Sequence, residues 1–109
     1  MALLDVGVED RVKAAAKTLS RIGNVRAIYI FGSQVDGGTD RWSDIDVAVF
    51  MEEVENWDIH QRARVMALVM EEAGSNVETH LFPISSFDNP MRGSFAEYII
   101  QHGVRVMES

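Results

Sequence analysis

The sequence has 109 residues and no cysteine, so it can form one hydrophobic core and excludes both a disulfide framework and a thiolate metal site. Hydrophobic residues make up 47% of the chain and charged residues 25%, which indicates a globular protein and not a disordered one. The formal net charge of −7 argues against nucleic acid as a tightly bound partner, because proteins bind phosphate backbones through clustered Lys and Arg.

We expect one domain that spans residues 1–109 and has no room for a second substrate-binding lobe. No apolar run approaches the roughly 18 residues of a membrane span. The N-terminal stretch MALLDVGVED carries acids where a signal peptide would carry basic residues. These features predict a cytoplasmic location.

A helix and a strand are predicted before the first polar loop. Apolar residues recur at helical spacing and are followed by the stop signal Gly23, with the inward positions Val8, Val12, Ala15, Leu19 and Ile22. The β-branched and aromatic residues from 25 to 31 are typical of a buried strand. Gly32 and Ser33 therefore lie where this strand gives way to a turn.

The second predicted strand opens with two aspartates. After the polar loop of residues 34–43, Asp44-Ile45-Asp46 begins a new apolar run. Because strand side chains alternate between faces, we expect Asp44 and Asp46 to project on one side of the strand. The other side is then formed by Ile45, Val47 and Val49. Two neighbouring carboxylates repel each other unless a cation joins them, so this pair is a candidate metal site.

Four further elements are predicted after residue 55. Asn56 is expected to cap a helix that closes at Gly74, with an inward face of Ile59, Ala63, Met66, Met70 and Ala73. Residues 77–82 follow as a third strand, whose only acid is Glu78.

The chain is then expected to form a loop over 84–90, a helix over 91–102 and an edge strand over 104–107. The inward residues of this last helix are expected to be Phe95, Tyr98 and Ile99. Its apolar residues exceed what one buried face requires, which leaves surface for a partner helix or a second copy of the chain. The order of elements predicts an α+β or α/β fold, with a small mixed sheet of three to four strands and helices mainly on one face.

The turn at Gly32 and the paired acids suit a nucleoside triphosphate bound to magnesium. Magnesium prefers oxygen ligands and binds through one or two carboxylates together with phosphate oxygens. Gly32 allows the backbone to approach a phosphate, and Ser33 offers an N–H and a hydroxyl. Arg41 is either a further phosphate contact or a solvated loop charge. His60, His80 and His102 share no ligand spacing, so they are assigned no role.

The pattern of Gly-Ser, ten residues, Asp-Ile-Asp and an apolar strand is similar to the signature of the DNA polymerase β-like nucleotidyltransferases. The short chain resembles their minimal branch. The resemblance implies two Mg²⁺ ions held by Asp44, Asp46 and Glu78, phosphate binding by Gly32 and Ser33, and transfer of AMP or another nucleoside monophosphate from ATP or another triphosphate to an acceptor hydroxyl. Minimal members often act as antitoxins on a helical HEPN partner, so the resemblance also implies such a toxin partner.

Two departures from this signature leave a second interpretation open. Gln34, Val35 and Asp36 stand where basic residues are common, and Glu78 stands where aspartate is more common. The alternative to an enzyme is a catalytically decayed module that neutralises its partner by forming a stoichiometric complex. A small-molecule nucleotidyltransferase is less favoured, because such enzymes need an additional substrate lobe.

Overall fold

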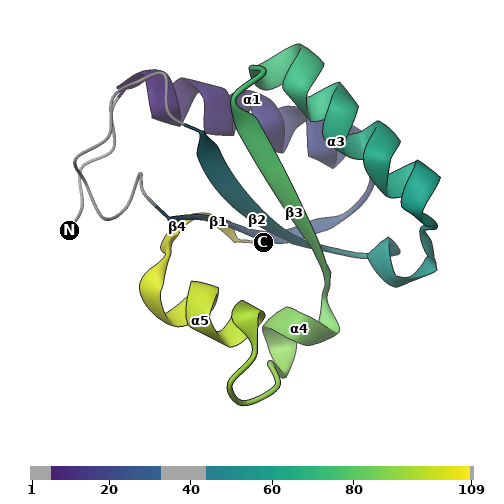
Figure 1. The fold of residues 1–109 in the computed structure, drawn as a ribbon, viewed down its shortest axis with the longest axis vertical. Coiled ribbons are helices and arrows are strands. Elements are labelled where there is room, and N and C mark those ends of the chain that lie inside the picture. Colours follow the sequence, from purple (N-terminus) through teal and green to yellow (C-terminus); the bar gives the residue numbers. More distant parts are fainter. Residues whose placement is uncertain (1–5, 33–43, 109) are drawn as a thin grey trace.

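A computed structural model describes residues 6–32 and 44–108 (Figure 1). The elements in chain order are α1 (Val6–Ile22), β1 (Val25–Phe31), β2 (Ile45–Met51), the 3-10 turn η1 (Val54–Asn56), α3 (Ile59–Ala73), β3 (Val77–Pro83), α4 (Ser85–Asp88), α5 (Phe95–His102) and β4 (Val104–Glu108). Within these two described ranges, none of the helices has both the length and the apolar character that crossing a bilayer requires.

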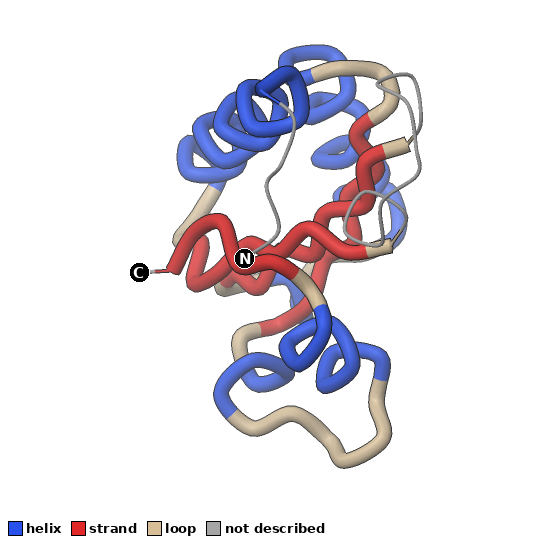
Figure 2. The backbone as a smooth tube through the Cα atoms, turned by 90° about the vertical axis from the view of Figure 1, so that its left-hand side faces the viewer, coloured by secondary structure: helices blue, strands red, loops and turns tan. Residues whose placement is uncertain are grey.

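The four described strands form one mixed sheet in the order β3-β2-β1-β4. β1 pairs antiparallel with β2 and β4, whereas β2 pairs parallel with β3. The long helices α1 and α3 cover one face, and the shorter α4 and α5 lie on the other (Figures 1 and 2). The predicted mixed α+β fold is therefore confirmed, including the edge position of the last strand.

The core between the sheet and the helices α1 and α3 follows the predicted alternation. Ile45, Val47 and Val49 are fully buried in this layer, which places Asp46 on the opposite face of β2. The inward residues expected in the first helix are buried there too, namely Val8, Val12, Ala15 and Leu19, with Ile22 packed at the margin. Burial of these aliphatic side chains fixes which face of β2 is left for polar residues.

The predicted inward face of α3 is wrong except at Ala73. Its buried residues are Val65, Val69 and Ala73, whereas Ile59 is 77% exposed and Met70 is 42% exposed. The sequence of this helix contains two apolar stripes at helical spacing. The buried stripe begins with a charged residue, so the sequence pattern favoured the other one. Arg62 lies on that stripe and donates hydrogen bonds to the carbonyls of Val54 and Trp57. Its aliphatic stem therefore packs inward, while its guanidinium provides hydrogen bonds to carbonyl groups of the preceding turn.

The start of α3 also differs from the expectation by two residues. Asp58, not Asn56, is the N-cap, and its carboxylate accepts from the Gln61 amide at 2.8 Å. The Gln61 side chain accepts in return from the Asp58 amide at 2.9 Å, which completes a capping box. Gly74 ends the helix as predicted.

The last helix is shorter than predicted. The expected loop over 84–90 contains the short helix α4, and α5 begins only at Phe95, where Ser94 caps it by accepting from the Glu97 amide at 3.2 Å. Ile99 is fully buried as expected, but Phe95 and Tyr98 are 51% and 55% exposed. The buried residues of this eight-residue helix are Ala96 and Ile99, because positions three apart share one side. The half-exposed Phe95 still contacts Phe31 of the sheet.

Candidate metal and phosphate site

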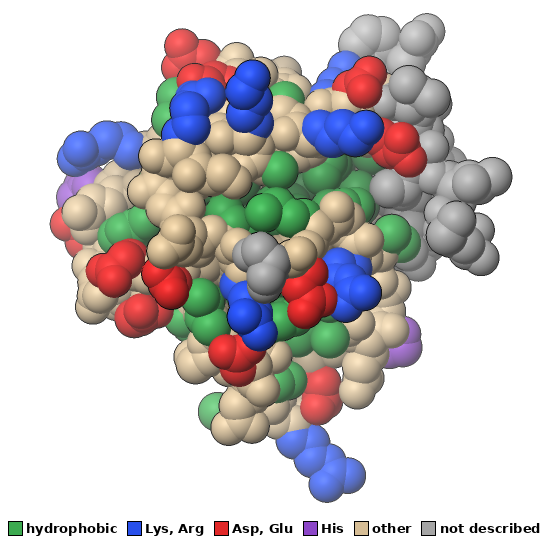
Figure 3. Space-filling view, turned by 180° about the vertical axis from the view of Figure 1, so that it is seen from behind, with side chains coloured by type: hydrophobic (Ala, Val, Ile, Leu, Met, Phe, Trp, Pro, Cys, Tyr) green, Lys and Arg blue, Asp and Glu red, His purple; other side chains and the backbone are tan. Residues whose placement is uncertain are grey.

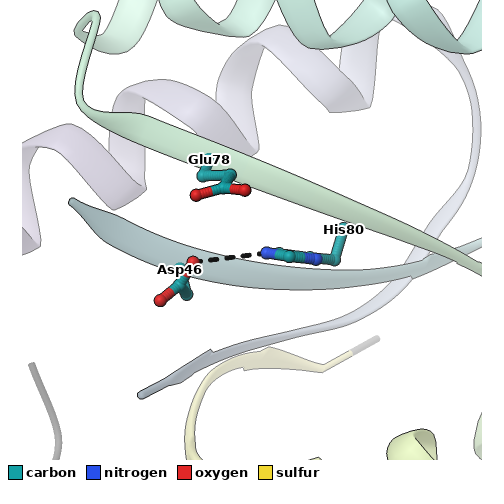
Figure 4. A group of neighbouring side chains, drawn as sticks. All are labelled: Asp46, Glu78 and His80. Atoms are coloured by element: carbon teal, nitrogen blue, oxygen red, sulfur yellow. Dashed lines mark hydrogen bonds and ion pairs between the residues drawn. The ribbon is translucent and has the colours of Figure 1, made fainter. Parts of the chain in front are cut away.

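The parallel pairing of β2 with β3 brings two predicted acids together. Asp46 lies directly opposite Glu78, and Ala48 lies directly opposite His80. Residues two apart on a strand share a face, so Glu78 and His80 project beside Asp46, on the face of the sheet that the long helices leave free (Figure 4). One group of side chains from two neighbouring strands results.

Asp46, Glu78 and His80 offer ligand atoms that all lie within 4.8 Å of one another. The His80 Nε2 is 3.3 Å from the Asp46 Oδ1, and the side chains of these two residues are only 29% and 26% exposed (Figure 4). Glu78 is exposed. The group is therefore partly desolvated on one side and open to a ligand on the other.

Gly32 lies against the second oxygen of the Asp46 carboxylate. Phe31, the last residue of β1, pairs with Asp46 across the sheet, and Gly32 follows with a φ of 80°. A Cβ at Gly32 would lie 2.8 Å from the Asp46 Oδ2. Glycine is required here both for the left-handed backbone and for the close approach of the carboxylate. The end of β1 and the acid on β2 therefore form one site.

Aromatic rings support the imidazole of His80. The ring of Phe31 meets it edge to face at a centroid distance of 5.0 Å, and Phe95 lies 6.3 Å away. Phe31 and Phe95 also contact each other at 5.4 Å. These contacts restrict how far the imidazole can rotate, so its Nε2 stays directed at Asp46.

The structure brings Asp46, Glu78 and Gly32 together and leaves Asp44 outside the group. Asp44 is exposed and precedes the first residue of β2. Ser33 and Arg41, predicted to bind phosphate, lie outside the described residues. His80 was missed from the sequence, where its only signal is its position two residues after Glu78 on the same strand.

Two carboxylates and an imidazole form a donor set that fits a divalent cation. Neighbouring ligands around an ion at 2.0–2.1 Å are about 3 Å apart, close to the separation between His80 and Asp46. The exposed carboxylate of Glu78 and the open side of the group leave room for oxygens of a phosphate. The arrangement can therefore bind a metal together with an anionic ligand.

The family described as Polymerase beta, Nucleotidyltransferase matches residues 13–109 of the chain. The chain belongs to this family. The resemblance seen in the Gly-Ser and Asp-Ile-Asp pattern is thereby confirmed.

Solved structures share the fold of the chain. The chain is similar to a candidate nucleotidyltransferase from Sulfolobus solfataricus, with 16% identity and a TM-score of 0.58 over 99% of this chain and 92% of the other. It is also similar to a toxin–antitoxin with AMP-PNP, with 21% identity, a TM-score of 0.59, and coverage of 93% and 73%. It is similar as well to a mutant of the toxin–antitoxin MntA-HpeT, with 19% identity and a TM-score of 0.58 over 93% of this chain and 73% of the other. No curated protein sequence matches the chain.

Proposed function

We propose that the chain transfers AMP, or another nucleoside monophosphate, from ATP or another triphosphate to a hydroxyl of a partner toxin in the cytoplasm, and acts as its antitoxin. The observation that carries the proposal is the Asp46 carboxylate, which lies between the Gly32 turn and Glu78. Family membership supports the reaction class. The toxin–antitoxin with AMP-PNP, an ATP analogue, supports the choice of nucleotide and of partner.

Asp44, Asp46 and Glu78 would hold Mg²⁺, which would neutralise charge on the phosphates and favour ionisation of the acceptor hydroxyl. The backbone of Gly32 and Ser33 would donate to phosphate oxygens, with Arg41 as a further contact. The acceptor oxygen forms a bond to the α-phosphorus while the bond from that phosphorus to pyrophosphate breaks. The hydroxyl proton passes to solvent.

The partner in this proposal is a helical toxin of the HEPN type. The described part of the chain forms one small sheet with four helices and one 3-10 turn and shows no separate acceptor-binding lobe, which favours an acceptor on another chain. Charges of both signs lie among one another on the face seen in Figure 3, and the net charge is −7. Both features favour a protein acceptor over a nucleic acid, which would require a basic surface.

Transfer of label from ATP carrying a radioactive α-phosphate tests the proposal. The protein is incubated with Mg²⁺ and a co-expressed HEPN-type toxin, and label on that toxin is measured. We expect label with wild type and with the control Glu71→Gln, which changes an exposed acid of α3, and none with Asp44→Asn combined with Asp46→Asn. Label that persists in the double variant would show that the acids do not carry the reaction.

A catalytically decayed binding module is the second candidate, and the exposed Asp44 outside the acidic group favours it. In that case the chain would neutralise the toxin by covering it. Neutralisation of the toxin in cells, unchanged by the same double variant and unaccompanied by label, would establish this function instead.

A further inference from the structure

We propose that His80 is itself a metal ligand, and that the centre of Asp46, Glu78 and His80 prefers a first-row transition-metal cation such as Mn²⁺ over Mg²⁺. The inference rests on the proposed function, because it concerns the metal of the same site. It departs from the all-carboxylate site that the sequence predicts. The observation behind it is that an imidazole nitrogen belongs to the compact donor group on β2 and β3.

The geometry places the His80 Nε2 where a ligand is needed. It lies 3.3 Å from the Asp46 Oδ1, whereas the Asp46 Oδ2 is the oxygen that faces Gly32. The two oxygens of Asp46 thus serve two sides of the site. Since neighbouring ligands around a divalent cation are about 3 Å apart, one ion can contact Asp46 and His80 without a change of strand register.

The surroundings of His80 favour a fixed ligand over a mobile surface side chain. Its side chain is 29% exposed, and the rings of Phe31 and Phe95 flank it. A ring that is already restricted loses little conformational entropy when it binds an ion. By contrast, His60 on α3 and His102 on α5 are exposed and do not belong to this group.

The chemistry of nitrogen then decides the choice of metal. Mg²⁺ is a hard cation that demands oxygen ligands, and replacing an oxygen by an imidazole nitrogen weakens its binding. First-row transition metals accept imidazole, and Mn²⁺ accepts carboxylates and phosphate oxygens as well. A site with two carboxylates and one imidazole therefore discriminates against Mg²⁺.

A merely orienting role for His80 gives a different expectation. If His80 only donates a hydrogen bond to Asp46, its loss would weaken Mn²⁺ and Mg²⁺ by the same factor, because both ions would still bind oxygen alone. Direct ligation instead predicts a loss that is specific to the transition metal and a nitrogen coupled to the bound ion.

The experiment measures Mn²⁺ binding by electron paramagnetic resonance and Mg²⁺ binding by competition, in the presence of AMP-PNP. The variants are His80→Gln and His80→Asn, with His60→Gln as the matched control. We expect wild type to bind Mn²⁺ more tightly than Mg²⁺. The two His80 variants should lose at least about tenfold in Mn²⁺ affinity and little in Mg²⁺ affinity. Echo-envelope modulation should show a directly bound nitrogen in wild type and His60→Gln and none in the two His80 variants.

Three outcomes would overturn the inference. They are equal losses of Mn²⁺ and Mg²⁺ affinity in the folded His80 variants, a nitrogen signal that persists in them, and the absence of any nitrogen signal in wild type. In each case transfer of label to the partner would still stand, so the proposed function would survive. If neither ion binds wild type with AMP-PNP present, the metal-dependent function fails together with the inference.

Discussion

One oxygen of the Asp46 carboxylate lies 2.8 Å from the point at which Gly32 would carry a Cβ. The turn that follows β1 and the start of β2 therefore approach each other so closely that a side chain at position 32 would collide with Asp46. Because the neighbouring atom is the end of a side chain, an added methyl group would push the carboxylate aside and leave the strands in place.

Substitution of Gly32 separates backbone strain from damage to the site. Gly32→Ala and the control Gly93→Ala both place alanine at a φ near 80°, but nothing lies within 4 Å of a Cβ at Gly93. We expect both variants to lose about 1–2 kcal/mol of unfolding free energy in urea, from the left-handed backbone alone. Only Gly32→Ala should also lose metal affinity, because the Asp46 carboxylate rotates away. Equal metal affinity in the two variants would contradict this assignment.

Neutralising Glu78 should abolish transfer of label without lowering the free energy of unfolding. Glu78 lies directly opposite Asp46, so without a cation the two negative charges repel each other. We expect Glu78→Gln to leave the free energy of unfolding in metal-free buffer unchanged or to raise it by up to about 1 kcal/mol. Transfer of label should be lost in the same variant. The control Glu71→Gln, on the exposed side of α3, should change stability by less than about 0.5 kcal/mol and retain activity. A clear destabilisation by Glu78→Gln would argue for a structural role.

Nucleotide and metal together should stabilise the folded protein. A ligand that binds only the native state at a hundredfold excess over its Kd contributes about 2.7 kcal/mol. We expect ATP with Mg²⁺ or Mn²⁺ to raise the melting temperature of wild type by several degrees and to leave that of Asp46→Asn unchanged. Calorimetry with and without the ligands provides the measurement. A flat response of wild type with the partner present would count against a nucleotide site.

The contact between α1 and α3 should make stability depend on pH. The Thr18 hydroxyl donates to the Glu72 carboxylate at 2.6 Å and Arg21 pairs with the same oxygen, and these contacts lower the pKa of Glu72 from 4.5. The unfolded chain then binds the proton more readily. The stabilisation is therefore present above about pH 4.5 and is lost as the pH falls through the lower pKa of the folded state.

We expect Glu72→Gln to be less stable than wild type at pH 7 and to approach it at acidic pH, below the pKa of the folded state. Urea unfolding at a series of pH values measures this difference. Glu71→Gln is the control, one position away and exposed. A difference between Glu72→Gln and wild type that stays constant across the series would exclude the assigned cause.

The buried stripe of α3 can be tested by a matched pair of neighbours. Val69 is fully buried and Met70 is 42% exposed. Val69→Ala should cost about 2 kcal/mol of unfolding free energy, because it removes buried methyl groups and leaves a cavity. Met70→Ala should cost less than about 0.5 kcal/mol in the same urea titration. The reverse order would restore the face predicted from the sequence.

The sequence by itself determined most of the local structure. β1 spans the predicted residues, and the alternation in β2 places Ile45 and Val47 in the core and Asp46 on the other face. The turn at Gly32 and the helix stop at Gly74 were predicted because each glycine follows a run with strand or helix periodicity. These features depend on backbone stereochemistry and on periodicity, which act over a few residues and are therefore visible in the chain.

Only the tertiary structure decided which elements meet. The register between β2 and β3 sets Asp46 opposite Glu78 and adds His80 to the site, and this register joins residues more than thirty positions apart. The buried face of α3 was likewise settled by packing, since Arg62 begins the inward stripe and its charge is accommodated by carbonyls of the preceding turn. Periodicity records how one element alternates, but the free energy that selects a register or a helix face comes from contacts between elements.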